Sequence, residues 1–298
     1  MGSNRTVRQK LALIKRSCDS RWTPEFHPVC HRIGTESAPH ADAAGGHLRH
    51  RIGTESVPYS APTWVFSSVT LVIAHRGASR AERENTLAAF TKAVELGADL
   101  VELDVRLTTD GALAVHHDAQ FADGRTIRDL AAADLPPDVP LLAAALDACR
   151  PLRVNVEIKN LAGEPGYDPT AEVAGIVADL IRERDQAARI IVSSFDLATL
   201  DRFHVEAPQV ETAYLVNLVG NVSRLLATLD ERGHHGLHPW HRRVTRRLVE
   251  RCHAAGVAVR PWTVDDPRRI AALAALEVDA ICTNVPDVAL AVLRGGPA

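Results

Sequence analysis

The hydrophobic and polar positions of the chain divide it into two unequal parts. Residues 1–68 show no sustained period of 2 or 3.6, whereas from about residue 69 short β-branched apolar runs alternate with longer segments of helical period. This alternation is typical of a parallel sheet with crossover helices. The pattern therefore predicts an α/β domain over residues 69–298, preceded by a segment of a different kind.

The alternating part predicts eight strands, each followed by a helix. The expected strands are 70–74, 100–104, 154–158, 190–193, 211–215, 236–238, 257–261 and 280–282. The expected helices are 86–96, 141–150, 170–185, 197–206, 222–232, 245–255, 267–275 and 287–293. Eight such units match a (β/α)8 TIM barrel, a fold of typically about 250 residues. A further short strand at 113–115 follows the Asp110-Gly111 turn and lies outside this count.

The first 68 residues contain a near-identical duplication, HRIGTESAP at 31–39 and HRIGTESVP at 50–58. Two copies are too few for a solenoid, which needs about three repeats to bury a core. Because five of the 14 histidines lie in this segment, a metal-binding or partner-binding tail is one interpretation. We favour a disordered extension, or sequence upstream of the true start codon, because nothing in the segment could offset the entropy of ordering it.

Composition and charge narrow the class of protein. A formal net charge of -3 argues against a nucleic-acid binder, which needs a concentrated basic surface. The five cysteines are odd in number and far apart, which favours reduced thiols and a cytoplasmic location. No apolar run approaches the roughly 18 residues of a membrane span. We expect a small-molecule partner, and the oligomeric state stays open.

Carboxylates that close two neighbouring strands are the first candidate site. In a parallel barrel the substrate lies at the carboxyl ends of the strands. Glu102 and Asp104 in LVELDV point to one side of their strand, and Glu157 in VNVEIK closes the next. Buried carboxylates repel one another unless a cation or a shared proton relieves them, so the three together favour a hard divalent metal ion. The alternative for each is a structural ion pair with a nearby base, namely Arg76, Arg106 or Lys159.

Histidines near the same strand ends are candidates for proton transfer, because the ordinary pKa of imidazole lies near neutral pH. His75 follows the first strand, and His116-His117-Asp118 forms a turn soon after the second. A lone histidine at a strand end is usually a satisfied polar residue. Two histidines with an arginine, a lysine and an acidic cluster instead suit a phosphate ester. No P-loop, dinucleotide-binding loop or G-x-S-x-G elbow is found.

The run IAHRGASRAERENTLAAFTKAVELGADLVELDVRLTTDGALAVHHD resembles the opening of the glycerophosphodiester phosphodiesterase family, with its HRG, ENT, E-x-D and HD elements in order. The segments VNVEIK, IIVSSFD, AGVAVRPWTVDD and VDAICTNVPD extend the resemblance to about residues 70–290. It implies a metal-dependent phosphoric diester hydrolase of glycerol and lipid metabolism. Such an enzyme converts glycerophosphodiesters to glycerol 3-phosphate and an alcohol, through a cyclic phosphate.

The same resemblance implies roles for individual residues. His75 and His117 become the general acid and base, and His117 is chosen over His116 because it directly precedes the aspartate. Arg76 and Lys159 are expected to contact the phosphate. Glu102, Asp104 and Glu157 are expected to bind Mg²⁺ or Ca²⁺.

Five further residues carry weaker expectations from the resemblance. Glu84 and Asn85 in the ENT element are expected to hold the first loop, although Glu84 could also reach the site. Trp262 is expected beside the glycerol or alcohol group, although a tryptophan at a strand end is often core, and Ser194 is a weaker candidate. Asn284 stands where the family often has Asp, which puts this contact of the eighth strand in doubt.

Two alternative functions stay open on the sequence. A related phosphodiesterase could act on lysophospholipids or sphingomyelin-like lipids, although the ENT and WTV elements argue against it. A catalytically inactive barrel could serve as a binding module, although every residue needed for the chemistry is present.

Overall fold

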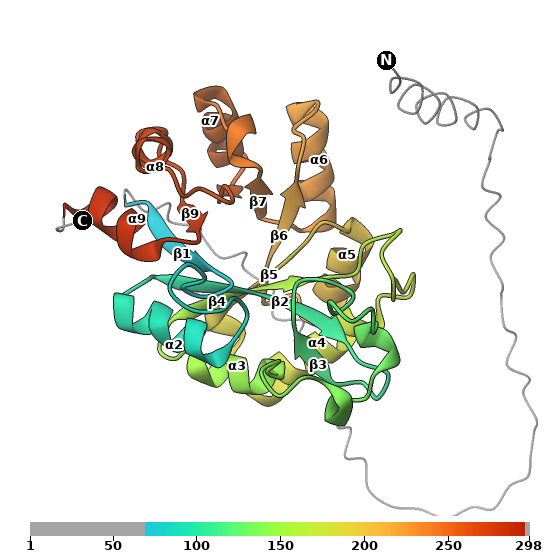
Figure 1. Cartoon of the computed structure of the whole chain (residues 1–298). Helices are drawn as coiled ribbons and strands as arrows, with labels where there is room; N and C mark the ends of the chain where they lie inside the picture. The colour runs from blue at the N-terminus through green and yellow to red at the C-terminus, as the bar shows by residue number, and fades with distance from the viewer. Residues whose placement is uncertain (1–68, 296–298) are drawn as a thin grey trace, which may run out of the picture. The chain divides into compact units, whose positions relative to one another are not determined.

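The computed structural model describes residues 69–295, so the extension predicted for residues 1–68 lies outside the described residues. Strands and helices alternate along this part of the chain (Figure 1). The strands are β1 Leu71–His75, β2 Leu100–Leu107, β3 Leu113–Val115, β4 Arg153–Ile158, β5 Ile190–Ser194, β6 Glu211–Val216, β7 Gly236–Pro239, β8 Ala258–Val259 and β9 Ala280–Thr283. The α-helices are α2 Leu87–Leu96, α3 Leu142–Ala148, α4 Glu172–Glu183, α5 Leu197–Glu206, α6 Val222–Arg232, α7 Arg246–Ala254, α8 Pro267–Ala274 and α9 Pro286–Arg294.

The parallel strands form a nearly closed barrel in the order β8-β7-β6-β5-β4-β2-β1-β9, which confirms the predicted fold class. The short strand β3 pairs antiparallel with β2 and stays outside this order, as predicted. The seam lies between β8 and β9, which share no strand ladder. Three backbone hydrogen bonds still cross it. The Asp279 amide donates to the Val259 oxygen at 3.0 Å, the Cys282 amide to the Pro261 oxygen at 2.9 Å, and the Val264 amide to the Cys282 oxygen at 2.9 Å.

Strand β8 is shorter than the predicted span of 257–261. Its neighbour β7 ends on Pro239, and Pro261 follows β8 directly after Arg260. Pro239 has no amide hydrogen to donate to β8, and Pro261 has none to donate on the β9 side, so regular pairing stops there on both sides of β8. The chain nevertheless stays extended, because the Trp262 amide donates to the Pro239 oxygen at 3.2 Å.

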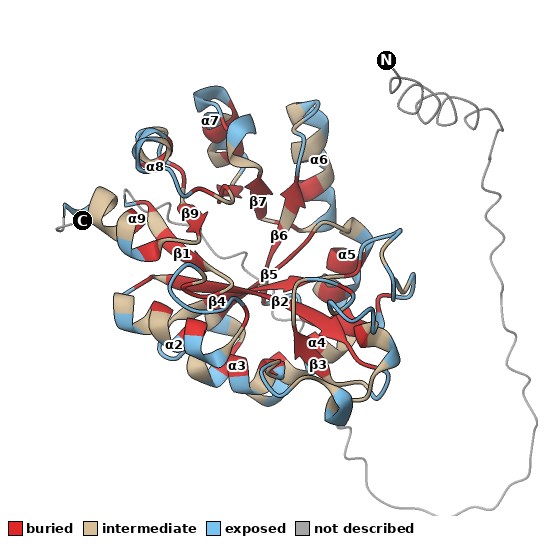
Figure 2. Cartoon of the chain, viewed as in Figure 1, coloured by how far each residue is buried: buried red, intermediate tan, exposed pale blue. Residues whose placement is uncertain are grey.

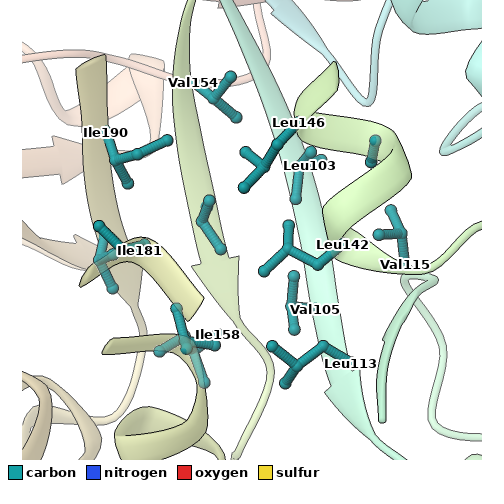
Figure 3. Packing of buried hydrophobic residues seen from close by; sticks show 14 of the residues in the cluster. Leu103, Val105, Leu113, Val115, Leu142, Leu146, Val154, Ile158, Ile181 and Ile190 are labelled. Atoms are coloured by element: carbon teal, nitrogen blue, oxygen red, sulfur yellow. The ribbon is translucent and has the colours of Figure 1, made fainter. Parts of the chain in front are cut away.

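The strands are buried on both faces, as expected for a parallel sheet covered by helices (Figure 2). Leu103 and Val105 of β2 point outward and pack against Leu142 and Leu146 of α3 (Figure 3). The alternate residues of the same strand point into the barrel. Apolar packing under the helices therefore places the carboxylates of β2 on the inner face.

Helix ends follow from capping side chains. Thr86, Asp196, Asn221, Thr245 and Asp266 each accept a hydrogen bond from an amide in the first turn of the following helix. These caps explain why the predicted helices are correct to within about two residues at most ends. None of the helices in residues 69–295 is long and apolar enough to cross a bilayer.

His234, just before β7, ties two barrel units together. Its side chain is completely buried. Its Nε2 donates to Asp201 Oδ1 of α5 at 3.1 Å, and its Nδ1 lies 2.9 Å from Thr212 Oγ1 of β6. Burial lowers the pKa of His234 despite the bond to Asp201. The folded protein therefore holds this imidazole in its neutral form near neutral pH.

We expect the His234→Gln variant to lose less stability than the wild-type protein when the pH falls from about 7.5 to about 5.5. Because the pKa of His234 is lowered on folding, the unfolded chain binds more protons below about pH 6.5, and wild-type stability falls as the pH falls. The difference is at most about 1.4 kcal/mol at pH 5.5, the cost of keeping one ordinary histidine uncharged there. Urea denaturation of both proteins measures it, and identical pH dependences would contradict the expectation.

Candidate active site

A cavity of about 260 Å³ lies at the carboxyl ends of the strands. Seven of the residues predicted from the sequence line it, namely His75, Arg76, Glu102, His117, Glu157, Lys159 and Trp262. The predicted Asp104 lies directly behind this wall and is almost fully buried. Residues far apart in the sequence are thus brought to one place, as the barrel geometry requires.

The three predicted carboxylates form one cluster on β2 and β4. Glu102, Asp104 and Glu157 each offer an oxygen, and these oxygens lie within 4.8 Å of one another. Lys159 Nζ lies 3.2 Å from Asp104 Oδ1 and 2.5 Å from Glu157 Oε1, and Arg76 Nε lies 3.2 Å from Asp104 Oδ2. The alternative of structural ion pairs is therefore realised for Asp104 and Glu157.

Burial and mutual repulsion separate the pKa values of the three acids. Burial, with the charge of Asp104, raises the pKa of Glu102 to about 8. Burial also raises the pKa of Glu157 to about 7, although Lys159 opposes the rise. The pKa of Asp104 is lowered, because Lys159 and Arg76 together outweigh its burial. Asp104 is thus ionised, whereas Glu102 needs a further cation to be ionised at neutral pH.

The cluster fits a divalent cation. Glu102 Oε1 is buried and has no hydrogen-bond partner within residues 69–295. Three carboxylates face two fixed cations, so one more cation is needed before all three can be ionised together at neutral pH. His75, Glu102 and Cys282 form a second possible group, but burial raises the pKa of the Cys282 thiol well above its usual range. The carboxylate oxygens are the better donors for a hard ion such as Mg²⁺ or Ca²⁺.

The loop after β1 is built around a left-handed turn. Arg76 has φ of 55° and Gly77 has φ of 80°, and a Cβ on Gly77 would lie 2.6 Å from the carbonyl carbon of Ala89. The turn aims the Arg76 amide at Glu102 Oε2, at 2.9 Å, and the Arg76 guanidinium at Asp104. Only glycine fits at position 77, which explains why the HRG element ends in glycine.

Asn85 and Glu84 support this loop from the other side. Asn85 is buried. Its backbone amide donates to the Arg76 carbonyl oxygen at 3.0 Å, and its side-chain Nδ2 donates to Asp104 Oδ2 at 2.8 Å. Glu84 accepts from Arg76 Nη1 at 2.8 Å, and half of its side chain is exposed. Glu84 does not line the cavity. It therefore holds the loop beside Arg76, which was the first expectation, and does not reach into the site.

His75 is oriented by the loop after β9. Its Nδ1 lies 2.7 Å from Asn284 Oδ1, and Asn284 Nδ2 donates to Asp265 Oδ2 at 2.7 Å. Because Asn284 donates its amide hydrogens to Asp265, its oxygen accepts from His75 Nδ1–H, which leaves Nε2 of the neutral ring as an acceptor. Burial and the charge of Arg76 lower the pKa of His75. The Asn in place of the family Asp therefore still makes the contact that the sequence put in doubt.

The two histidines of the turn after β3 point to different surroundings. His117 lines the cavity, and its Nδ1 donates to Asp118 Oδ1 at 2.7 Å. His116 instead packs edge-on against Phe121, with ring centres 4.8 Å apart. The Arg106 guanidinium holds the turn by donating to the His117 oxygen, so Arg106 is not a partner of the acidic cluster.

Trp262 and Ser194 differ in what they can contact. Trp262 lines the cavity, donates from Nε1 to the His238 oxygen at 2.7 Å, and packs edge-on against Phe195. Ser194 is buried and donates its hydroxyl to the Ile158 oxygen at 2.8 Å. The Ser194 hydroxyl therefore joins β5 to β4. Ser194 does not line this cavity, but it borders an adjoining hollow that shares His117, Glu157 and Lys159 with it.

Sequence reasoning missed several residues that line the cavity, among them Asn155, Phe195, His238 and Arg260. Asn155, His238 and Arg260 are buried, and each has a polar atom without a hydrogen-bond partner in the described part of the chain. Gly236 leaves room for Arg260, since a Cβ there would lie 3.2 Å from Nη1. The signal was the two-residue strand period, because Asn155 precedes Glu157 by two and Arg260 precedes Trp262 by two.

Comparison with known proteins identifies the family. The sequence model of the glycerophosphoryl diester phosphodiesterase family matches residues 75–288. The chain belongs to this family. It is 33% identical to a glycerophosphodiester phosphodiesterase of Caldanaerobacter subterraneus over 76% of this chain and 99% of that protein. It is 31% identical to the glycerophosphodiester phosphodiesterase of Bacillus altitudinis over 74% of this chain and 97% of that protein.

A solved structure extends the likeness to three dimensions. The crystal structure of a putative glycerophosphoryl diester phosphodiesterase from Silicibacter pomeroyi is 27% identical, with a TM-score of 0.69 over 76% of this chain and 94% of that one. Membership of the glycerophosphoryl diester phosphodiesterase family confirms the resemblance read from the HRG, ENT, E-x-D and HD elements. The matched residues 75–288 begin at His75, the first residue of the candidate site.

Proposed function

We propose that this protein hydrolyses glycerophosphodiesters to glycerol 3-phosphate and an alcohol, using a divalent cation and two histidines. The observation that carries the proposal is the single cavity in which His75, His117, Arg76 and Lys159 meet a cluster of three carboxylates. Cations for the phosphate oxygens and imidazoles for two proton transfers are what phosphodiester hydrolysis needs. The names of the relatives from Caldanaerobacter and Bacillus support the same substrate class.

Glu102, Asp104 and Glu157 would hold the cation, which would supply positive charge for the phosphate oxygens. Arg76 and Lys159 line the cavity beside these acids and contribute fixed positive charge. The pKa of Lys159 is raised, because Glu157 and Asp104 outweigh its burial. The lysine therefore remains an ammonium ion and serves in binding, not as a base.

The hydrogen bonds of the two histidines support a different first role for each. His75 donates from Nδ1 to the Asn284 amide oxygen and is kept neutral beside Arg76, so its Nε2 can accept a proton from the 2-hydroxyl of the glycerol. That hydroxyl oxygen forms a bond to phosphorus while the bond to the alcohol oxygen breaks. Burial lowers the pKa of His117, and the pairing with Asp118 opposes this and so favours the imidazolium that protonates the departing alcohol. Water then opens the cyclic phosphate with the two roles reversed.

The cavity walls bear on the alternatives. Phe195, Trp262 and Leu215 supply apolar surface, so a lipid phosphodiester such as a lysophospholipid stays the second candidate substrate. A binding module without activity is less well supported, because Glu102 and Glu157 have raised pKa values that a purely structural site has no reason to maintain. The cysteines at 149, 252 and 282 are buried free thiols, which supports the expected cytoplasmic location.

The Glu102→Gln variant should lose at least about 100-fold in turnover and bind Mg²⁺ or Ca²⁺ at least about 10-fold more weakly, because it removes one anionic oxygen from the cluster. Calorimetric titration with the metal alone measures the binding without reference to activity. Glu183→Gln, on the exposed face of α4, is the matched control and should behave as wild type. Full wild-type activity after exhaustive treatment with EDTA would show that the metal assignment is wrong.

His75→Ala and His117→Ala should each lower turnover by roughly 100-fold to 10,000-fold, the usual contribution of a positioned acid or base. His116→Ala should have a small effect, because His116 packs against Phe121 and does not line the cavity. Steady-state kinetics on glycerophosphocholine compare the three variants. Equal damage from His116→Ala and His117→Ala would reverse their assignment.

A substrate analogue that lacks the 2-hydroxyl of the glycerol should still bind, through its phosphate, but turn over at least about 100-fold more slowly, equivalent to about 2.7 kcal/mol of barrier. The reason is that an attacking hydroxyl carried by the substrate has the advantage of proximity over free water. Competitive inhibition measures binding, and release of the alcohol measures turnover. Turnover equal to that of the parent diester would exclude attack by the substrate.

A further inference from the structure

A second hollow, of about 340 Å³, lies between α6 and α7, outside the candidate active site. We name it the basic groove. Its lining includes Val219, Val222, Arg242, Arg243, Arg247 and Arg251. The loop before α6 and the turn before α7 both follow barrel strands (Figure 1). The groove that they line therefore lies at the same end of the barrel as the active-site cavity.

The charge of the basic groove differs from that of the rest of the domain. Residues 69–298 carry 25 Lys or Arg against 32 Asp or Glu, a net charge of -7. Within 242–251, however, there are five arginines and one acidic residue, Glu250. A local excess of arginine on an acidic domain creates a positive potential that attracts an anionic partner to one face.

The arginines of the groove lack the carboxylate partners found elsewhere. Within residues 69–295, no ion pair joins Arg242, Arg243, Arg247 or Arg251 to a carboxylate. Arg251 donates to Ser223 Oγ at 2.8 Å, which links α7 to α6. By contrast, Arg182 on α4 and Arg202 on α5 pair with Asp179 and Glu206 of their own helices. The groove therefore presents guanidinium groups whose charge is not compensated within the domain.

Apolar and aromatic groups border these guanidinium groups. Leu218, in the loop before α6, has 68% of its surface exposed and adjoins Val219 of the groove. Arg242 and Arg243 lie over the ring of Trp240, at 5.7 and 5.8 Å from its centre. Arginine together with an exposed leucine and a half-buried tryptophan is a side-chain combination that suits the polar–apolar boundary of a bilayer. A soluble anion would make no use of Leu218.

The groove is joined to the wall of the active-site cavity. The His241 amide donates to the Trp262 oxygen at 3.0 Å, and residues 240 and 262 form a parallel bridge. Since Trp262 lines the cavity, a surface that contacts Arg242 and Arg243 lies beside the cavity mouth.

We propose that the basic groove and Leu218 bind the surface of an anionic phospholipid bilayer, with the barrel end that carries the cavity turned toward the membrane. The phosphates of the lipid headgroups would contact the four arginines, and Leu218 would enter the apolar boundary. The proposal does not depend on the proposed function, although the two agree. A glycerophosphodiester is a glycerophospholipid that has lost both acyl chains, so the reaction that supplies it is ester hydrolysis at a membrane.

Vesicle flotation of the full chain tests the proposal. Wild type should bind vesicles of phosphatidylglycerol mixed with phosphatidylcholine far better than vesicles of phosphatidylcholine alone, and high salt should weaken the binding. A variant with four Arg→Gln substitutions in the groove should bind at least about 100-fold more weakly, since each arginine near the surface contributes roughly 5-fold. Those positions are Arg242, Arg243, Arg247 and Arg251. Residues 1–68 are present in every variant, so their own charge cancels from the comparison.

The matched control replaces four arginines elsewhere by glutamine and has the same formal charge; they are Arg125, Arg182, Arg202 and Arg294. This control should bind anionic vesicles within about 5-fold of wild type. Both variants should melt and hydrolyse a water-soluble glycerophosphodiester as wild type does, which separates a lost membrane contact from a misfolded domain. A Leu218→Ser variant should reduce the binding that persists at high salt.

Three outcomes would overturn the proposal. One is equal vesicle binding by wild type and the groove variant. Another is an equal loss in the groove variant and the control, which would mean that net charge alone is responsible. The third is binding of inorganic phosphate in the groove without any binding to anionic vesicles, which would make the groove a site for a soluble anion.

Discussion

Three carboxylates buried within 4.8 Å of one another impose the requirement that the rest of the site meets. Unbalanced, they would repel strongly enough to protonate or to destabilise the barrel. Arg76 and Lys159 balance Asp104, and the Arg76 amide is aimed at Glu102. The pKa of Glu102, about 8, shows that this balance is incomplete. An incompletely balanced acidic cluster is what allows both a cation and an anionic substrate to be accommodated together.

The fold offsets the cost of burying such a cluster, because each strand has an outer face that packs against helices and an inner face that carries the site. In β2, the outward residues Leu103 and Val105 pack under α3, and this apolar layer holds the strand whatever its inner residues are. The inner positions near the carboxyl ends of β2 and β4 are then available for acids. The left-handed turn at Arg76 and Gly77 is also unfavourable by itself, because Arg76 has a positive φ. Asn85 and the packing of Gly77 against α2 hold it in place.

Charge is distributed differently inside and beside the cavity. Inside, the acids of β2 and β4 are paired with Arg76 and Lys159, which follow β1 and β4, at distances of a few ångströms, and a small change in position alters their pKa values. In the basic groove, between α6 and α7, the arginines pair with no carboxylate among residues 69–295, so their effect is long-ranged and sensitive to salt. The first arrangement suits chemistry on one phosphate, and the second suits attraction to a surface that carries many.

The sequence by itself determined the order of the elements, the barrel and seven of the residues that line the cavity, because strand period, helix caps and polar strand ends are local properties. Glu102, Asp104, Glu157, His75 and His117 could be chosen this way. Only the tertiary structure decided what each of them contacts. His75 meets Asn284, 209 residues away, and Arg260 enters the cavity because Gly236 of another strand leaves it room. Ser194, which resembled a site residue, proved to donate inward to Ile158. Such contacts depend on barrel closure and on side-chain packing between strands, and neither is encoded in the residues next to them along the chain.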